Sequence, residues 1–381
     1  HCDFFKNNLW FAPTNRRMVD ELASHATRIE RHVAAEGRDP VEAFLDSCLS
    51  LENLIDIYAP YAPPRKGDDE QAPRDVIRFE AKSYMDPFIN PPEFIAEQRQ
   101  QIEEERQRPA SFPRRPERDV LQFLVEHAPL REWQRDLLAM IREEAYYFAP
   151  QRLTKVMNEG WASYWHSRMM TEKLLDPSEI IDFAERHAGA MAMQPGQVNP
   201  YKLGIELFRD VEDRWNKGRF GKEYEDCDDL DTKRSWDTGL RRGREKIFEV
   251  RRIYNDVTFV DEFLTPEFCD EQKLFTYDYN PKTGRREING RDYREIKDRM
   301  LHSLANGGQP VIEVKDGNFR NRGELVLSHR HDGEDLDLVQ SRGTLEHLHR
   351  LWTRPVHIET VLEERPRRLT YDGESHELAD L

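Results

Sequence analysis

The sequence has few cysteines and no long hydrophobic run. Its 381 residues include four cysteines, which lie far apart and form no CxxC pair. This spacing indicates neither a disulfide framework nor a cysteine-rich zinc site, and it is typical of proteins in a reducing cytoplasm. There is also no run of eighteen apolar residues and no signal-like hydrophobic start, so we expect no membrane span.

Basic residues are outnumbered by acidic ones. The chain has 57 Lys and Arg against 73 Asp and Glu, a net charge of −16. Such a surface repels nucleic acid and anionic membranes, so we expect neither as a partner. The length is sufficient for two or more domains with cores of their own. The chain opens on His1 without an initiator Met, and we expect a sequence trimmed upstream.

Helical periodicity dominates the first 274 residues. In the stretch 14–37, Met18, Leu22, His25, Ile29 and Val33 recur at spacings of three and four, which predicts an amphipathic helix. A second helix is predicted over 39–58. Charged and proline-rich stretches near 59–118 predict extended surface excursions, and helical patterns resume after them. We therefore predict a bundle-like helical domain over residues 1–274.

The remaining residues, 275–381, have a different character. Helical patterns at 293–306 and 335–352 alternate with strand-like patterns at 309–317, 323–333, 355–364 and 367–373. The order α-β-β-α-β predicts a small α+β domain with a sheet. The fold class is therefore mainly α, with a smaller α+β domain at the C-terminal end.

Imidazole and carboxylate side chains fall within several predicted helices. Glu159 and His166 are seven residues apart, about two helical turns, and project from one side of a helix rich in aromatic residues. Glu52 and Asp56 are four apart on the second predicted helix. The candidate site residues together are His1, His25, Glu52, Asp56, Glu159 and His166. Zinc, iron or manganese takes such ligands, and helical bundles build such sites, so the set predicts a divalent metal centre with zinc first.

Two other interpretations stay open. A histidine on an apolar stripe is often a hydrogen-bonded core residue, and Glu52 and Asp56 would then be solvated or paired with Arg16 and Arg28. The sequence has no HExxH motif. The C-terminal residues also offer histidines for a metal site, namely His329, His331, His347 and His349.

Specific blocks of the sequence resemble a known family. They include "FFKNNLWF", "TNRRMVDELASHATRIE", "VEAFLDSCLSLENLIDIY", "YFAPQRLTKVMNEGWASYWHSRMM" and "HRHDGEDLDL". In order and over nearly the whole chain, these blocks resemble the stage V sporulation protein R (SpoVR) family. The resemblance implies a cytoplasmic protein of spore cortex formation and stress response. It also implies two partners, a PrkA-type serine kinase and a von Willebrand-type protein.

The resemblance extends to one candidate ligand. Family members usually carry another histidine shortly before the residue that matches His1, and this sequence lacks it. "NEGWASYW" also resembles the Glu-Gly-x-Ala stretch of gluzincin metallopeptidases, whose glutamate is the third zinc ligand. Glu159 would then be a ligand, His1 would stand on the histidine side, and Glu52 or Asp56 would act as base. Two functions follow: a metal-dependent hydrolase of amidase or peptidase type, or a non-catalytic regulator that docks the two partners.

Overall fold

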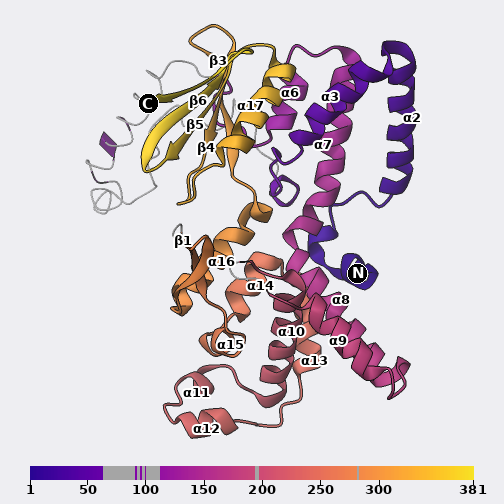
Figure 1. Ribbon diagram of the computed structural model, residues 1–381, viewed down its shortest axis with the longest axis vertical. Helices are drawn as coiled ribbons and strands as arrows, with labels where there is room; N and C mark the ends of the chain where they lie inside the picture. Colours follow the sequence, from indigo (N-terminus) through magenta and orange to yellow (C-terminus); the bar gives the residue numbers. More distant parts are fainter. Residues whose placement is uncertain (63–90, 92–94, 97–98, 100–111, 194–196, 281–282) are drawn as a thin grey trace, which may run out of the picture. The chain divides into compact units, whose positions relative to one another are not determined.

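The structure is a computed structural model that describes residues 1–62, 91, 95–96, 99, 112–193, 197–280 and 283–381. It confirms a mainly helical protein with a smaller α+β arrangement at the C-terminal end (Figure 1). Most of the extended excursions predicted near 59–118 lie outside the described residues. Among the helices of the described ranges, none is both long enough and apolar enough to cross a lipid bilayer.

The chain divides into two compact units, each made of two separate segments. We call the first the helical unit, His1–Met18 with Tyr146–Gln309, and the second the sheet unit, Val19–Ala145 with Pro310–Leu381. The domain boundary between residues 274 and 275 stays a prediction from the sequence.

The helical unit is built around α8 and α10, which pack along each other. Its elements are α1 (Cys2–Asn7), a 3₁₀ turn (Leu9–Phe11), α8 (Lys155–Met169), a π-helical turn (Met170–Leu174), α9 (Ile180–Ala190), α10 (Pro200–Lys217), α11 (Lys222–Glu225), α12 (Leu230–Ser235), α13 (Gly243–Ile253), α14 (Asp256–Phe263), α15 (Pro266–Glu271), the hairpin β1 (Thr276–Asn280) and β2 (Arg285–Gly290), α16 (Tyr293–Leu304) and a second 3₁₀ turn (Ala305–Gly308). Fully buried aromatic side chains from α1, α8 and α10, such as Phe4, Trp161 and Phe208, form its core.

Two glycines allow α8 and α10 to approach closely. A Cβ atom on Gly160 would lie 2.4 Å from the backbone of Gly204, and one on Gly204 would lie 2.2 Å from the carbonyl oxygen of Val156. These separations are far below van der Waals contact, so any larger residue would force the two backbones apart. Gly160 directly follows Glu159, so this glycine sets how closely the carboxylate approaches α10.

A buried carboxylate holds the N-terminal end of α8. Asp256, the first residue of α14, accepts hydrogen bonds from the backbone N–H groups of Val156 (2.8 Å) and Met157 (2.9 Å). These N–H groups belong to the first helical turn and have no partner within the helix. Burial raises the pKa of Asp256 to about 7, although hydrogen bonds from the backbone lower it. The carboxylate therefore joins α14 to the helix that carries Glu159.

The sheet unit combines helices with a five-stranded sheet. Its elements are α2 (Met18–Glu36), which begins at the boundary of the units, α3 (Arg38–Ser50), a 3₁₀ turn (Ala59–Tyr61), α6 (Val120–His127), β3 (Ile312–Phe319), β4 (Glu324–His329), α17 (Leu338–Trp352), β5 (Val356–Leu362), β6 (Arg365–Tyr371) and β7 (His376–Asp380). The long helix α7 (Glu132–Leu153) contributes residues to both units.

The strands are ordered β3-β4-β5-β6-β7 along the sheet. Only β4 and β5 are parallel, and α17 connects them and packs on β5 and β6 (Figure 1). Parallel neighbours need such a crossover, whereas the antiparallel pairs are joined by short turns. The four predicted strands are confirmed as β3, β4, β5 and β6, and the two predicted helices as α16 and α17. Strand β7 and the hairpin of β1 and β2 were not predicted from the sequence.

The second predicted helix is shorter than expected. α3 ends at Ser50, and Leu51 to Asn53 form a turn. The prediction that Glu52 and Asp56 share a helical face is therefore wrong. Leu51, Ile55 and Ile57 are all buried, at an irregular spacing that no single helical face could bury.

Candidate functional site

The first residues of the chain are anchored to α8 and α13 of the helical unit. Asp3 of α1 accepts hydrogen bonds from the indole Nε1 of Trp161 (3.0 Å) and from the guanidinium of Arg251 (2.6 Å). The neighbouring Phe4 is completely buried. This anchoring fixes the position of His1, the residue directly before α1, beside α8.

His1 and Glu159 lie together, as the resemblance implied. The Nδ1 atom of His1 is 3.0 Å from the amide oxygen of Asn158, and its Nε2 atom is 3.9 Å from Oε2 of Glu159. An amide oxygen only accepts hydrogen bonds, so Nδ1 is the donor of the neutral ring. The Nε2 lone pair therefore faces the carboxylate, and Asn158 orients the ring.

The donor atoms of this pair suit a divalent metal ion. A distance of 3.9 Å is too long for a hydrogen bond. Ligand bonds of about 2.0–2.2 Å allow one ion to contact two atoms at about this separation. Imidazole nitrogen and carboxylate oxygen are both ligands of zinc, iron and manganese. Nε2 of His1 and Oε2 of Glu159 are therefore atoms of the kinds that such an ion binds, and the metal site itself stays a prediction.

Tyr201 of α10 completes the surroundings of Glu159. The negative charge of Glu159, more than burial or the hydrogen bond between the two, raises the pKa of the Tyr201 phenol. A tyrosine phenol carries its proton at neutral pH even without this shift, so Tyr201 is a hydrogen-bond donor beside Glu159. Tyr201 was not predicted from the sequence, because its relation to Glu159 depends on the packing of α8 on α10. Asn158 directly precedes Glu159, but its contact with His1 depends on the position of α1.

His166 lies elsewhere in the same unit. Its ring is exposed and contacts Phe183 of α9, with ring centroids 5.6 Å apart. Burial, and then the positive charges of Arg209 and His166, lower the pKa of the nearby His187. The structure thus brings His1 to Glu159 and places His166 with α9, two helical turns further along α8. The role of His166 as a metal ligand stays a prediction.

His25 belongs to the sheet unit and is almost fully buried, with 2% of its surface exposed. Its Nδ1 atom lies 2.7 Å from Oε1 of Glu144 on α7, and its Nε2 atom faces Glu143 and Glu21. His25 was predicted from the sequence as a metal ligand, but neither Glu143 nor Glu144 was predicted to lie beside it. Glu21 and His25 are four residues apart on α2, and this spacing was a signal that could have paired them.

Glu52 and Asp56 also belong to the sheet unit. Glu52 is half-buried in the turn after α3, and Asp56 is buried. Asp56 pairs with Arg118 at 3.6 Å and accepts a hydrogen bond from the backbone of Tyr58. The structure does not place Arg28 there, because Arg28 pairs with Asp136 on α7. The assignment of Glu52 or Asp56 as the catalytic base stays a prediction.

Two of the C-terminal histidines have other partners. His329 lies 2.8 Å from the hydroxyl of Thr360, and His331 pairs with Asp335 at 2.9 Å. Within the described ranges, only Glu21, His25 and Glu143 form a group of three or more side chains with ligand atoms close enough for one ion.

A groove of about 540 Å³ lies in the helical unit between α8, the π-helical turn, α9 and α10. Its lining includes Arg168, Lys202 and Arg209 together with apolar residues such as Phe183. Lys202 is the residue after Tyr201. The groove therefore offers cationic groups over an apolar floor, close in sequence to the surroundings of Glu159.

Comparison with known proteins gives a family for both parts of the chain. Residues 1–309 match the family model described as "SpoVR like protein", and residues 310–363 match the "SpoVR-like C-terminal domain". The chain belongs to the SpoVR family. A SpoVR-like relative is the "Uncharacterized protein YcgB" of Escherichia coli (strain K12), 28% identical over 390 residues, which cover 96% of this chain and 72% of the relative. No solved structure matches the chain.

Proposed function

We propose that this SpoVR-family protein is a cytoplasmic metal-dependent hydrolase of amidase or peptidase type that serves spore cortex formation and stress response. The observation that carries the proposal is the pair of His1 and Glu159, with Nε2 and Oε2 3.9 Å apart and the imidazole oriented by Asn158. An oriented imidazole beside a carboxylate is the arrangement in which helical proteins hold zinc, iron or manganese.

Each residue of the pair has a defined task. His1 and Glu159 would hold the ion, and Asn158 would fix the tautomer of His1. When bound, a divalent ion polarises a carbonyl group and lowers the pKa of a bound water. Tyr201, whose phenol carries its proton at neutral pH, would donate a hydrogen bond to an oxygen that gains negative charge.

The groove beside α9 indicates the class of substrate. Arg168, Lys202 and Arg209 line it, and the apolar residues between them suit aliphatic substituents. Peptides with free carboxylates, such as those derived from peptidoglycan, combine these two properties. Lys202 and Arg209 both pair with Glu206, so an anionic substrate would compete with this glutamate for the two cations.

The test is an amidase and peptidase screen on the full-length protein, purified without chelator or affinity nickel, beside Glu159→Gln. We expect near-stoichiometric zinc, iron or manganese in the wild type and a fall in kcat/KM of about 100-fold or more in the variant. Loss of an outer partner of a metal ligand alone lowers metal affinity or activity by about 10–100-fold. Tyr201→Phe should lower kcat while leaving the metal content unchanged.

The matched control is Glu185→Gln, an exposed glutamate on α9, which should leave both metal content and activity unchanged. Equal activity and equal metal content in the wild type and in Glu159→Gln would contradict the proposal. So would a wild-type protein that holds no metal after reconstitution and has no activity on any amide substrate.

One observation favours a second function, the docking of partners without catalysis. None of the α9 side chains is buried, and the adjacent Ile180 and Ile181 are 37% and 75% exposed. Exposed apolar side chains on one helix suit a protein partner, and the resemblance supplies two, the PrkA-type serine kinase and the von Willebrand-type protein. In this function the polar residues around Glu159 would only stabilise the fold.

Pull-down of the two partners distinguishes the two functions. If docking is the function, Ile181→Glu should abolish capture of a partner by the full-length protein, whereas Glu159→Gln should leave capture and cellular function intact. If Ile181→Glu captures both partners as well as the wild type does, α9 is not the docking surface.

A further inference from the structure

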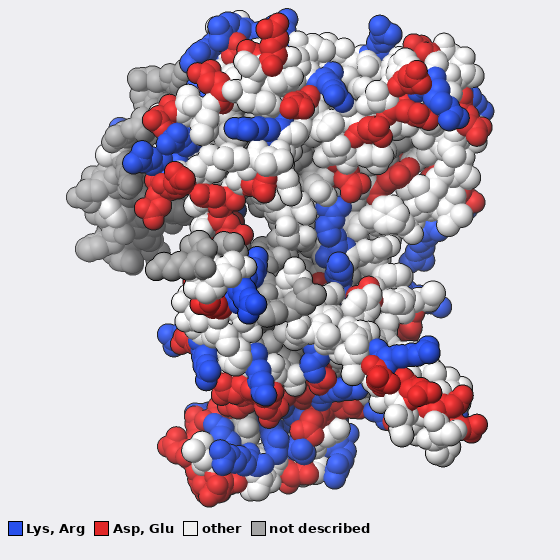
Figure 2. Space-filling view, viewed as in Figure 1, with Lys and Arg blue, Asp and Glu red and all other residues white. Residues whose placement is uncertain are grey.

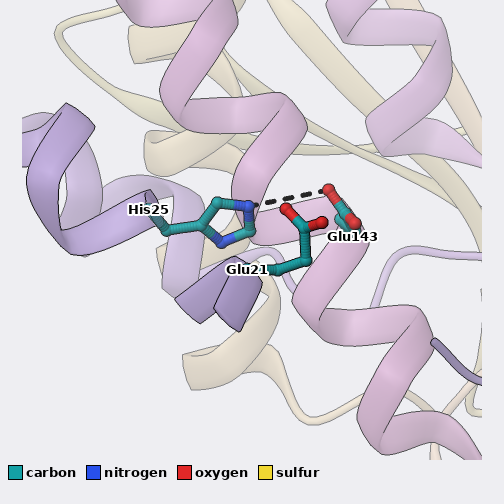
Figure 3. A group of neighbouring side chains, drawn as sticks. All are labelled: Glu21, His25 and Glu143. Carbon is teal, nitrogen blue, oxygen red and sulfur yellow. Dashed lines mark ion pairs between the residues drawn. The ribbon is translucent and has the colours of Figure 1, made fainter. Parts of the chain in front are cut away.

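A second histidine–carboxylate group lies in the sheet unit, on α2 and α7. Glu21 and His25 stand four residues apart on α2, and Glu143 reaches them from α7 (Figure 3). One ligand atom from each of the three side chains lies within 4.8 Å of the others. Figure 3 shows both carboxylates directed toward the imidazole.

The buried ring has an unused nitrogen. His25 Nδ1 lies 2.7 Å from a carboxylate oxygen of Glu144, so Nδ1 is the donor of this hydrogen bond. Nε2 is inaccessible to solvent and makes no hydrogen bond, and Oε2 of Glu143 is 3.6 Å away from it. A buried polar atom without a partner is uncommon in folded proteins and needs a physical reason.

An ion pair alone does not explain this geometry. A protonated Nε2 would be a buried donor whose closest carboxylate stands beyond hydrogen-bond distance. A neutral ring would direct its lone pair at two carboxylates, which is repulsive. A cation among the three groups removes both difficulties, because Nε2 and the two carboxylates then bind the same positive charge.

The neighbouring histidine of α2 provides a contrast on the same two helices. His32 Nε2 lies 2.8 Å from Oδ2 of Asp136 on α7, and Arg28 pairs with the same carboxylate. These groups satisfy one another without an ion. His25 differs because its Nδ1 atom is already hydrogen-bonded to Glu144, so only its Nε2 atom remains available as a ligand.

We propose that Glu21, His25 and Glu143 bind a divalent transition-metal ion such as zinc. Glu144 fixes the tautomer of His25 and increases its basicity, as carboxylates do for many metal-bound histidines. Zinc ligands stand about 3.3–3.6 Å apart around the ion, so the two flexible glutamates need to move inward by about 1 Å. The site does not rest on the hydrolase proposed above, because none of its residues is part of the His1–Glu159 pair.

The test measures zinc binding by equilibrium dialysis of chelator-treated full-length protein, with thermal unfolding as a second measurement. Glu143→Gln and Glu21→Gln should each weaken one zinc site by about 10-fold or more and abolish its contribution to the zinc-dependent rise in Tm, because a ligand that binds only the folded state raises stability. Glu30→Gln, an exposed glutamate on α2, should bind as the wild type does. Magnesium should not replace zinc, because magnesium prefers an all-oxygen shell.

A second set of variants separates this site from the first. If both sites exist, Glu159→Gln and Glu143→Gln each lose one equivalent of zinc, and the double variant loses two. Loss of zinc only in Glu159→Gln would overturn the site at His25 while leaving the hydrolase intact. Loss of zinc only in Glu143→Gln would confirm the site at His25 and overturn the metal site at His1 and Glu159. Unchanged binding in both Glu143→Gln and Glu21→Gln would show that His25 is only an ion-pair partner.

Discussion

His1 and His25 are each paired with carboxylates, but their surroundings differ. The side chain of His1 is 52% exposed and is oriented by a neutral amide, whereas that of His25 is 2% exposed and is oriented by the carboxylate of Glu144. A carboxylate partner makes the free nitrogen a stronger donor to a cation than an amide does. The more buried histidine is therefore the better permanent ligand, and the exposed one is more accessible to a substrate.

The two histidines also depend on different parts of the fold. The surroundings of Glu159 are set by the close approach of α8 and α10 at two glycines and by the hydrogen bonds from α8 to Asp256. The group around His25 needs only side chains on α2 and α7. Backbone packing thus controls the first site, and side-chain chemistry controls the second.

The largest expected effect comes from the helix contact. Gly204→Ala places a Cβ atom 2.2 Å from the carbonyl oxygen of Val156, so α8 and α10 must separate. We expect a loss of about 3 kcal/mol or more in the free energy of unfolding, measured with denaturant, because overpacking against backbone relaxes poorly. Zinc binding at Glu159 should fall in the folded fraction, whereas binding at His25 should not.

The control for this substitution is Gly189→Ala on α9, where an added Cβ atom meets nothing within 4 Å. Alanine is the better helix former, so stability should stay the same or rise by about 0.5–1 kcal/mol. If Gly204→Ala were as stable as Gly189→Ala, the two helices would not be in close contact.

An intermediate effect should distinguish the two histidines. In metal-free protein, His25→Ala removes the buried donor of a charge-assisted hydrogen bond, and we expect a loss of about 2–3 kcal/mol in the free energy of unfolding. His1→Ala should lose about 1 kcal/mol or less, because the side chain of His1 is itself half exposed. Equal losses measured by denaturant unfolding at pH 7 would contradict the difference in burial.

Counted per pH unit, the smallest effect concerns Asp256. Its pKa rises from the ordinary value of 3.8 to about 7 on folding, so the folded protein keeps a proton that the unfolded chain releases between these values. The free energy of unfolding should therefore fall as pH rises from about 4 to 7, with a slope of at most about 1.4 kcal/mol per pH unit from this group. Asp256→Asn should flatten this slope in a pH series of denaturant midpoints, and an unchanged slope would assign it to other groups.

Much of the fold follows from hydrophobic periodicity. The strands β3 to β6 and the helices α16 and α17 follow from period-2 and period-3.6 patterns. Although the net charge of the chain is −16, acidic and basic side chains are interspersed on the face seen in Figure 2. The short hairpin of β1 and β2 was missed because β2 is almost entirely exposed and shows no apolar alternation. The end of α3 was misplaced because the turn after it is buried, which makes it as apolar as a helix.

The candidate site was only partly accessible from sequence. Pairing His1 with Glu159 needed the family resemblance, because 157 residues separate His1 from Asn158, which orients it. In the sequence, Glu143 and Glu144 are two adjacent acidic residues on a charged helix. Only the packing of α7 on α2 brings them to His25. Local patterns identify residue types and faces, but the partners of each side chain depend on long-range packing.

The interleaved segments of the two units have a consequence for synthesis on the ribosome. In the sheet unit, the helices of Val19–Ala145 pack against the later segment Pro310–Leu381. In the helical unit, α1 packs against the later segment Tyr146–Gln309. Because the chain emerges from its N-terminal end, α3 and α6 leave the ribosome long before α17 and β3, which pack on them. Their apolar faces remain uncovered during that interval, so this stage of biogenesis is the one at which chaperones would be needed most.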